Sequence, residues 1–288
     1  MRILVDLRRH SRALAIPANH DRIDPGRRLM CLILWAWERH PRYRLVLAAN
    51  RDEFYARASR PADFWPGRPQ ILAGRDLQAG GTWLALSRQG RMAAITNFRD
   101  PAAHNPGARS RGELVADFVA GRESPGRYLA GILGRVHDYN GFNLLAATAG
   151  DDGLVYLGSR EGRVRKIAGG IHGLSNHLLD TPWPKVAGGR AELERVLRED
   201  RVTPERLLRL LCDRRRPGDA GLPDTGVGLE WERILAPRFI VSPAYGTRSA
   251  TVLLWERTGQ VDFFEWTFVP GQDPPRVAEK RHFRFLIA

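Results

Sequence analysis

Cysteine is scarce in this sequence. Its 288 residues contain two cysteines, Cys31 and Cys212, which lie far apart and form no C-x-x-C motif. A disulfide framework or a structural zinc site needs more cysteines, or clustered histidine and cysteine ligands, so neither organises this fold. We expect no metal, no cofactor and a reducing, cytoplasmic location.

Long apolar segments are also missing. No stretch approaches the roughly 18 apolar residues that identify a transmembrane helix, so we expect no integral membrane segment. The 43% hydrophobic content and eight tryptophans are typical of a chain that folds around a core. These features predict a soluble globular protein.

Lysine is nearly absent, although the chain is basic. The formal net charge is +13, and Lys166, Lys185 and Lys280 are the only lysines. A strong positive charge suggests nucleic-acid binding, but that function usually needs a clustered basic patch, and these arginines are spread along the chain. We predict no nucleic-acid partner. Anionic small molecules remain candidate partners, because guanidinium groups bind phosphates and carboxylates.

The first 29 residues differ from the rest. They contain seven arginines and three aspartates, with no sustained period of 2 or 3.6. Met30-Cys31 then directly precedes the apolar segment 32–37. We predict that residues 1–29 are a mis-annotated or disordered extension and that the natural start is Met30; a cleaved propeptide is the alternative. Removal of Met30 would expose the α-amine of Cys31.

Strands are predicted at both ends of the remaining chain, with helices between them. The expected strands are 31–37, 44–49, 70–73, 82–87, 92–97, 142–147, 154–157, 164–167, 247–256, 260–268 and 281–286. The expected helices are 110–120, 124–137, 181–199 and 203–212; the last two begin with Thr and have Pro in the first turn. This order favours an α+β fold over an alternating parallel sheet. Residues 30–288 are predicted to form one domain.

Cys31 would have unusual chemistry at a chain terminus. The α-amine, with an unperturbed pKa of about 7.7–8.0, can accept the thiol proton, so nucleophile and base share one residue. An ordinary buried cysteine is the alternative reading of this position.

Four consecutive polar residues follow the second predicted strand. Asn50-Arg51-Asp52-Glu53 comes directly after an apolar segment. On a strand, Asn50 and Asp52 would face one way and Arg51 and Glu53 the other, so one pair could face a cleft beside Cys31. A solvated strand end or an internal salt bridge is the alternative.

These motifs resemble the NRDE, or Transport and Golgi organisation, family, along nearly the whole chain from Met30. The matching segments are Met30-Cys31, Ala48-Ala49-Asn50-Arg51-Asp52-Glu53, Ala73-Gly74-Arg75-Asp76, Gly80-Gly81-Thr82-Trp83, Thr96-Asn97, Gly173-Leu174-Ser175-Asn176 and Tyr245-Gly246-Thr247-Arg248-Ser249. Members of this family have been linked to haem trafficking and to lipid or acyl-coenzyme A metabolism.

The same segments are similar to the active site of choloylglycine hydrolases and penicillin V acylases, which are N-terminal-nucleophile hydrolases. The resemblance implies a four-layer αββα sandwich. It also implies a catalytic set: Cys31 as nucleophile, Arg51 with Asp52, Asn97, Asn176 and Arg248. In that group the acid lies three residues after the arginine, whereas here the two are adjacent. Either Asp52 or Glu53 can therefore be the site acid.

Three further side chains are candidate substrate-binding residues: Asn50, Glu53 and Trp83. For Trp83, a purely structural indole is the alternative. His172 and His177 flank Asn176 and suggest either a metal or haem site or simple loop capping.

We therefore predict a cysteine amidohydrolase or acyltransferase that acts on a small-molecule acyl amide or thioester. A non-catalytic carrier of haem, acyl-coenzyme A or lipid on the same fold is the alternative.

Overall fold

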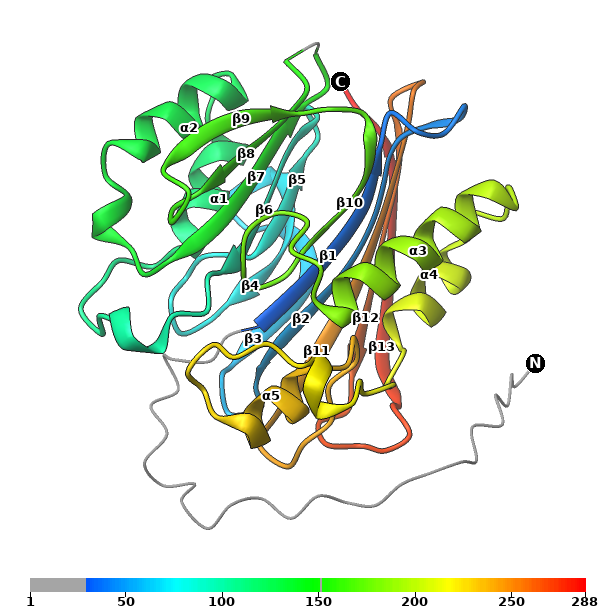
Figure 1. Cartoon of the computed structure of the whole chain (residues 1–288). Helices are drawn as coiled ribbons and strands as arrows, with labels where there is room; N and C mark the ends of the chain where they lie inside the picture. Colours follow the sequence, from blue (N-terminus) through cyan, green and yellow to red (C-terminus); the bar gives the residue numbers. More distant parts are fainter. Residues whose placement is uncertain (1–29, 151) are drawn as a thin grey trace.

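The computed structural model describes residues 30–150 and 152–288, and two antiparallel sheets dominate it (Figure 1). The six-stranded sheet has the order β10 (Gly170–Leu174), β1 (Met30–Trp37), β2 (Tyr43–Phe54), β11 (Tyr245–Glu256), β12 (Gln260–Phe268) and β13 (Val277–Leu286). The seven-stranded sheet runs in chain order: β3 (Ser59–Trp65), β4 (Arg68–Asp76), β5 (Leu84–Ser87), β6 (Arg91–Asn97), β7 (Phe142–Thr148), β8 (Leu154–Gly158) and β9 (Arg163–Ile167). The predicted extension 1–29 lies outside the described residues.

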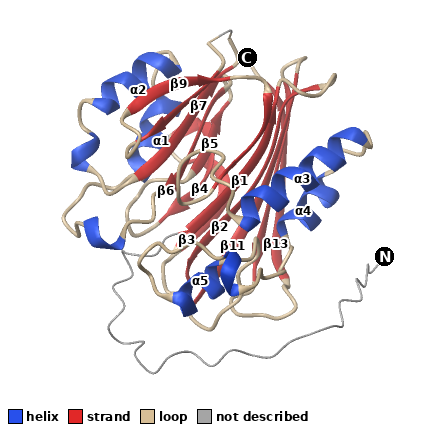
Figure 2. Ribbon diagram, viewed as in Figure 1, coloured by secondary structure: helices blue, strands red, loops and turns tan. Residues whose placement is uncertain are grey.

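Helices cover the outer faces of both sheets, as Figure 2 shows. Helices α1 (Gly112–Ala120) and α2 (Pro125–Leu133) pack on the seven-stranded sheet. Helices α3 (Pro184–Arg198) and α4 (Pro204–Leu211) pack on the six-stranded sheet. A short helix, α5 (Leu229–Leu235), follows the polar loop after α4. The predicted α+β, four-layer αββα sandwich is confirmed. No helix of the described residues is both long and apolar enough to span a bilayer.

The central strands are buried on both faces, which explains their nearly continuous apolar sequences. In β1, Ile33 and Trp35 belong to the core between the two sheets. Leu32 and Leu34 belong to the core beneath α3 and α4. Because side chains alternate along a strand, residue 31 shares the inner face with residues 33 and 35. This parity places Cys31 between the sheets.

Three elements were missed by the sequence prediction: β3, β10 and α5. Strand β3 is an edge strand with polar residues such as Arg60 and Asp63, so it lacks a long apolar run. Strand β10 is short and contains Gly170 and Gly173. Strand β2 is also longer than predicted, and it includes the whole segment from Asn50 to Glu53. Pairing with β1 and β11 keeps this polar segment extended.

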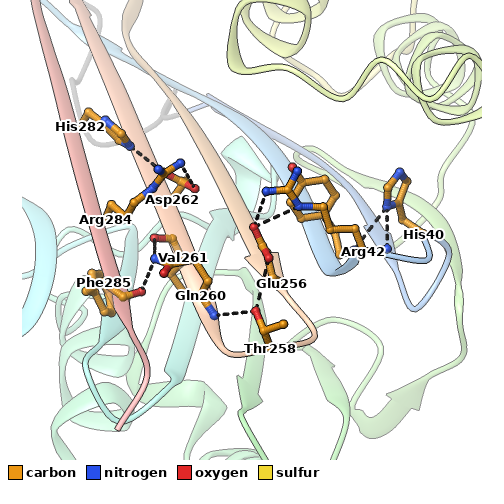
Figure 3. A network of polar contacts seen from close by, with 11 residues as sticks. His40, Arg42, Glu256, Thr258, Gln260, Val261, Asp262, His282, Arg284 and Phe285 are labelled. Atoms are coloured by element: carbon orange, nitrogen blue, oxygen red, sulfur yellow. Dashed lines mark hydrogen bonds and ion pairs between the residues drawn. The ribbon is translucent and has the colours of Figure 1, made fainter.

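Strand β13, one edge of the six-stranded sheet, pairs with β12, and charged side chains add contacts between the two strands (Figure 3). Asp262 on β12 accepts hydrogen bonds from Arg284 Nε and His282 Nε2, both at 2.7 Å. Burial alone would raise the pKa of Asp262, but the hydrogen bonds from Arg284 and His282 lower it. Charged side chains on an exposed edge discourage pairing with a second chain.

Glu265 on β12 provides a pH-dependent contact between the sheets. Its side chain is 2% exposed, and its Oε1 accepts a hydrogen bond from the Ala62 amide of β3 at 2.6 Å. Burial raises its pKa to about 7, from an ordinary 4.5. Between these two values the folded protein keeps a proton that the unfolded chain releases, so stability should fall as pH rises from about 4.5 to 7 and then level off.

Replacing Glu265 tests this assignment. In Glu265→Gln the side chain keeps its shape and its acceptor oxygen but cannot ionise. We expect the decline in unfolding free energy between pH 5 and 7, on the order of 2–3 kcal/mol in wild type, to flatten in the variant. Urea unfolding at several pH values measures it. An unchanged pH profile would contradict the assignment.

Candidate functional site

Cys31 lies at the start of β1, directly opposite Arg51 of β2. Directly opposed residues of antiparallel strands project to the same face, so both side chains enter the space between the sheets. The thiol is half-buried. Burial, followed by the charge of Asp52, raises its pKa to about 12, although Arg51 and a hydrogen bond from the Asp52 backbone oppose the rise. With residue 30 attached, this thiol holds its proton at neutral pH.

The segment Asn50-Arg51-Asp52-Glu53 divides its side chains between two faces of the sheet. Asn50 faces the helical layer, where its Nδ2 donates to the backbone oxygens of Leu211 at 3.0 Å and Arg238 at 2.7 Å. Arg51 faces the other sheet, and its guanidinium lies 4.4 Å from the Trp83 ring centre. Asn50 therefore connects the strand to the helical layer and points away from the face that holds the thiol.

Arg51 is held in a buried ion-pair cluster. Its Nη2 lies 3.4 Å from Glu53 Oε2 and 3.9 Å from Asp76 Oδ2. Arg57 shares the same two carboxylates, at 3.5 Å and 2.7 Å. Only 5% of the Arg51 side chain is exposed, and its buried Nη1 has no hydrogen-bond partner among the described residues. The Nη2 of Arg51 therefore lies next to two carboxylates, whereas its Nη1 has no hydrogen-bond partner among the described residues.

Trp83 forms the opposite wall of this cluster. Its ring lies against Gly74, where an added Cβ would come within 2.3 Å of the ring. The indole therefore fills space that only glycine leaves open, and the Arg51 guanidinium lies over its ring. Trp83 both packs against the core and contacts Arg51.

Asp52 faces the helices, opposite residue 30 of β1. Its Oδ1 accepts a hydrogen bond from Thr247 Oγ1 at 2.5 Å, whereas its buried Oδ2 has no partner among the described residues. Burial raises its pKa to about 6, although the charge of Lys185 opposes the rise. Lys185 of α3 is itself buried, which lowers its pKa to about 8, and its Nζ donates to the Leu235 oxygen at 3.1 Å.

The two predicted asparagines lie together through a hydrogen-bond chain that also reaches β1. Ser175 Oγ donates to the backbone oxygen of Cys31 at 3.0 Å and lies 3.0 Å from Asn176 Oδ1. Asn176 Nδ2 donates to the Asn97 backbone oxygen at 3.0 Å. Thr96 Oγ1 donates to the Ser175 oxygen at 2.6 Å. These bonds connect the end of β6 and the end of β10 to the start of β1.

Arg248 occupies a β-bulge in β11, between Thr247 and Ser249. Its Nη1 donates to the backbone oxygens of Phe54, Tyr55 and Arg57, at 3.0–3.1 Å. Burial lowers its pKa, and the charge of Arg51 lowers it further. Arg248 thus holds the segment at the end of β2 in place through three hydrogen bonds, and it adds positive charge near Arg51.

Comparison with known proteins identifies the family. The family model described as Transport and Golgi organisation 2 matches residues 30–270. The chain belongs to this family. A Transport and Golgi organization protein 2 homolog from Bos taurus is 39% identical over 272 residues, which cover 88% of this chain and 98% of the bovine protein. The Drosophila melanogaster protein is 28% identical, with coverage of 88% and 97%.

One solved structure was matched with a low TM-score. A mutant conjugated bile acid hydrolase from Clostridium perfringens covers 90% of this chain and 97% of its own, with a TM-score of 0.39 and 7% sequence identity.

Several residues of this Transport and Golgi organisation 2 member interact with Cys31 or Asp52 but were not singled out from the sequence. Ser175 and Thr247 lie inside the motifs that carried the resemblance, and their hydroxyl groups were available as a signal. Lys185 is one of only three lysines and comes from the first turn of α3. Arg111 precedes α1 and lies near Cys31, although the two are 80 positions apart in sequence. No local pattern indicates that approach.

The two flanking histidines have structural partners. His172 Nδ1 lies 2.8 Å from Asp180 Oδ2, and His177 Nδ1 lies 2.9 Å from Thr181 Oγ1. Among residues 30–150 and 152–288, no three histidine, cysteine or acidic side chains gather as a metal site would require. His172 of β10 therefore holds the loop that contains Asp180, and His177 holds its own loop through Thr181.

Close backbone packing positions Arg111. A Cβ at Gly81 would lie 2.5 Å from the backbone carbon of Gly112, and Thr82 N donates to Gly112 O at 3.3 Å. We expect Gly81→Ala to lower the unfolding free energy by about 1–3 kcal/mol, because backbone must move to admit the methyl group. Gly126→Ala on α2 is the matched control: its methyl group meets open space and should be neutral or slightly stabilising. Equal effects in urea unfolding would refute the packing argument.

Proposed function

We propose that this protein is a cysteine amidohydrolase or acyltransferase that acts on small-molecule amides or thioesters, with Cys31 as an N-terminal nucleophile. One observation carries the proposal: β1 begins at residue 30, and the position opposite that residue is Asp52, a buried carboxyl with an unpartnered oxygen. Loss of Met30 would leave the α-amine of Cys31 beside the Asp52 carboxyl. A thiol nucleophile also favours a reducing, cytoplasmic location.

The α-amine would act as the base. A thiol with a pKa of about 12 is a poor nucleophile at neutral pH, so a nearby proton acceptor is needed. An α-amine titrates near 7.7–8.0 and would accept the thiol proton as sulfur attacks the carbonyl carbon. Asp52 Oδ2 would accept a hydrogen bond from the resulting ammonium. This role favours Asp52 over Glu53, which pairs with Arg51 and Arg57 on the other face.

Asn176 would stabilise the tetrahedral intermediate. Its side chain belongs to the hydrogen-bond chain that reaches the Cys31 backbone oxygen through Ser175, and its Nδ2 donates to Asn97 O. A donor aimed at the developing oxyanion lowers the barrier by about 3 kcal/mol. Collapse of the intermediate then breaks the carbonyl–nitrogen or carbonyl–sulfur bond, and the ammonium returns its proton to the leaving group. Water or an amine next attacks the acyl-cysteine and releases the acyl group.

A carrier function would not require a nucleophile at the start of β1. The buried, unpartnered oxygen of Asp52 opposite residue 30 instead supports chemistry at the chain terminus. We therefore place the catalytic proposal first.

The decisive experiment is covalent labelling of protein whose translation starts at Met30. Intact mass should show loss of Met30, and an acylating ester should then add one acyl group per chain, located at Cys31. A chain that keeps Met30, or that takes up no acyl group after Met30 is lost, would refute the proposal.

A further inference from the structure

Several guanidinium groups lie near Cys31. Arg51 and Arg57 pair with Glu53 and Asp76, and the charge of Arg51 also acts on the buried Asp52 and Glu265. Arg111 interacts electrostatically with Cys31 and Arg248 with Arg51, and neither forms an ion pair with an acidic side chain of the described residues. Burying charges without matching partners is costly, so these guanidinium groups next to a reactive thiol indicate a ligand that brings negative charge.

Arg51 offers an unused donor at this place. Its Nη2 faces Glu53 and Asp76, whereas its Nη1 is buried and has no partner among the described residues. Leaving a buried charged donor unsatisfied is expensive, and such groups normally find a partner. Arg51 is opposite Cys31 in register, so a group bound to Nη1 would lie close to the sulfur.

Arg111, the residue before α1, also interacts electrostatically with Cys31. The residue before α1 is fixed by the Gly81–Gly112 contact, and its Nη1 donates to the Gly141 oxygen at 3.0 Å. Burial lowers its pKa to about 10, and the nearby Cys31 charge partly restores it. Neither Arg57 nor Arg248 is as available, because Arg57 binds Asp76 and Arg248 binds three backbone oxygens.

We propose that the substrate carries a compact anionic group, a carboxylate or a phosphate, next to the bond that Cys31 attacks, and that Arg51 and Arg111 bind it. This inference rests on the proposed function and adds a substrate class to it. One guanidinium group from β2 and one from the residue before α1 provide N–H donors in planar forks, which suit the oxygens of either anion. Arg111 is thereby assigned as a substrate-binding residue.

Two alkylating reagents of nearly equal size test the inference. Iodoacetate is anionic and iodoacetamide is neutral; with either, the thiolate displaces iodide and forms one sulfur–carbon bond. We expect the iodoacetate-to-iodoacetamide rate ratio at Cys31 to exceed that of Cys212 and of glutathione by about 10–100-fold. Cys212 is a suitable reference because burial, without a neighbouring charge, accounts for its raised pKa. Peptide mass spectrometry separates the two cysteines.

Arg111→Gln should bring the ratio at Cys31 close to that at Cys212. Arg109→Gln is the matched control, since Arg109 is in the same loop but is 52% exposed and pairs with Glu113; it should leave the ratio unchanged. If Arg111→Gln does not fold, the comparison of the wild-type rate ratio at Cys31 with the ratios at Cys212 and glutathione still tests the inference. A wild-type ratio equal to the references would overturn the inference.

Protection experiments distinguish the two anions. Inorganic phosphate or succinate should slow iodoacetamide labelling of Cys31 more than sodium chloride at equal ionic strength. Protection by phosphate indicates a phosphate group, and protection by succinate indicates a carboxylate. Equal slowing by all three salts would overturn the inference. Absence of any iodoacetamide reaction at Cys31 would instead refute the proposed nucleophile, so the two failures are distinguishable.

Discussion

Cys31→Ala, made in protein that starts at Met30, is expected to abolish acyl transfer to the chain and any hydrolysis that depends on it. The thiol is the proposed attacking group, so no acyl-enzyme can form without it. Cys212→Ala should keep full labelling, because Cys212 is a partly buried thiol at the end of α4, packed against the core beneath the helices. Intact mass after exposure to an acylating ester measures the result.

A form of the chain that retains residues 1–30 tests whether the reactivity of Cys31 depends on its free α-amine. Protein that retains residues 1–30 blocks the α-amine, and its Cys31 keeps a pKa of about 12 instead of the ordinary 9.0. The thiolate fraction at neutral pH should then be about 1,000-fold lower than for an ordinary thiol, and labelling should be slower by a similar factor. Equal labelling of the blocked and processed forms would contradict the role of the amine.

Glu232→Ala is expected to cause the largest loss of stability among single changes at charged residues. Glu232 Oε2 lies 2.5 Å from Arg99 Nη1, and both side chains are at least 96% buried. Its Oε1 also accepts hydrogen bonds from Thr225 N and Oγ1. Removing one partner of a buried ion pair leaves the other charge uncompensated and costs about 3–5 kcal/mol.

This ion pair also supports the candidate site. The Arg99 backbone N–H donates to Asn176 O at 2.8 Å, and its guanidinium lies 4.7 Å from the Trp183 ring centre. Loss of Glu232 should therefore reduce both thermal stability, by roughly 10 °C, and the labelling rate of Cys31.

Glu230→Ala is the matched control for this prediction. Glu230 is on the same helix, α5, but is exposed, and its removal should change stability by no more than about 0.5 kcal/mol. Glu232→Gln, which keeps the shape and loses the charge, should fall between the two. Comparable melting temperatures for Glu232→Ala and Glu230→Ala would show that the ion pair does not stabilise the fold.

Much of the fold follows from local pattern. The apolar segment 32–37 predicts a buried strand, and the turn at Thr258-Gly259 predicts a hairpin of the strands 247–256 and 260–268. Thr203 and Pro204 correctly marked the start of α4, where Thr203 Oγ1 accepts the Arg206 N–H. Strand β3 could not be found in this way, because its edge position removes the need for an apolar pattern.

For the candidate site, the sequence by itself determined which residue types are present, and it indicated that Arg51 and Asp52 face opposite ways if the strand continues through them. Only the tertiary structure decided which face holds the thiol, because that depends on the register between β1 and β2. It also decided that Arg111, Lys185 and Ser175 interact with Cys31 or Asp52. Their approach depends on packing between elements far apart in the chain, which no local spacing encodes.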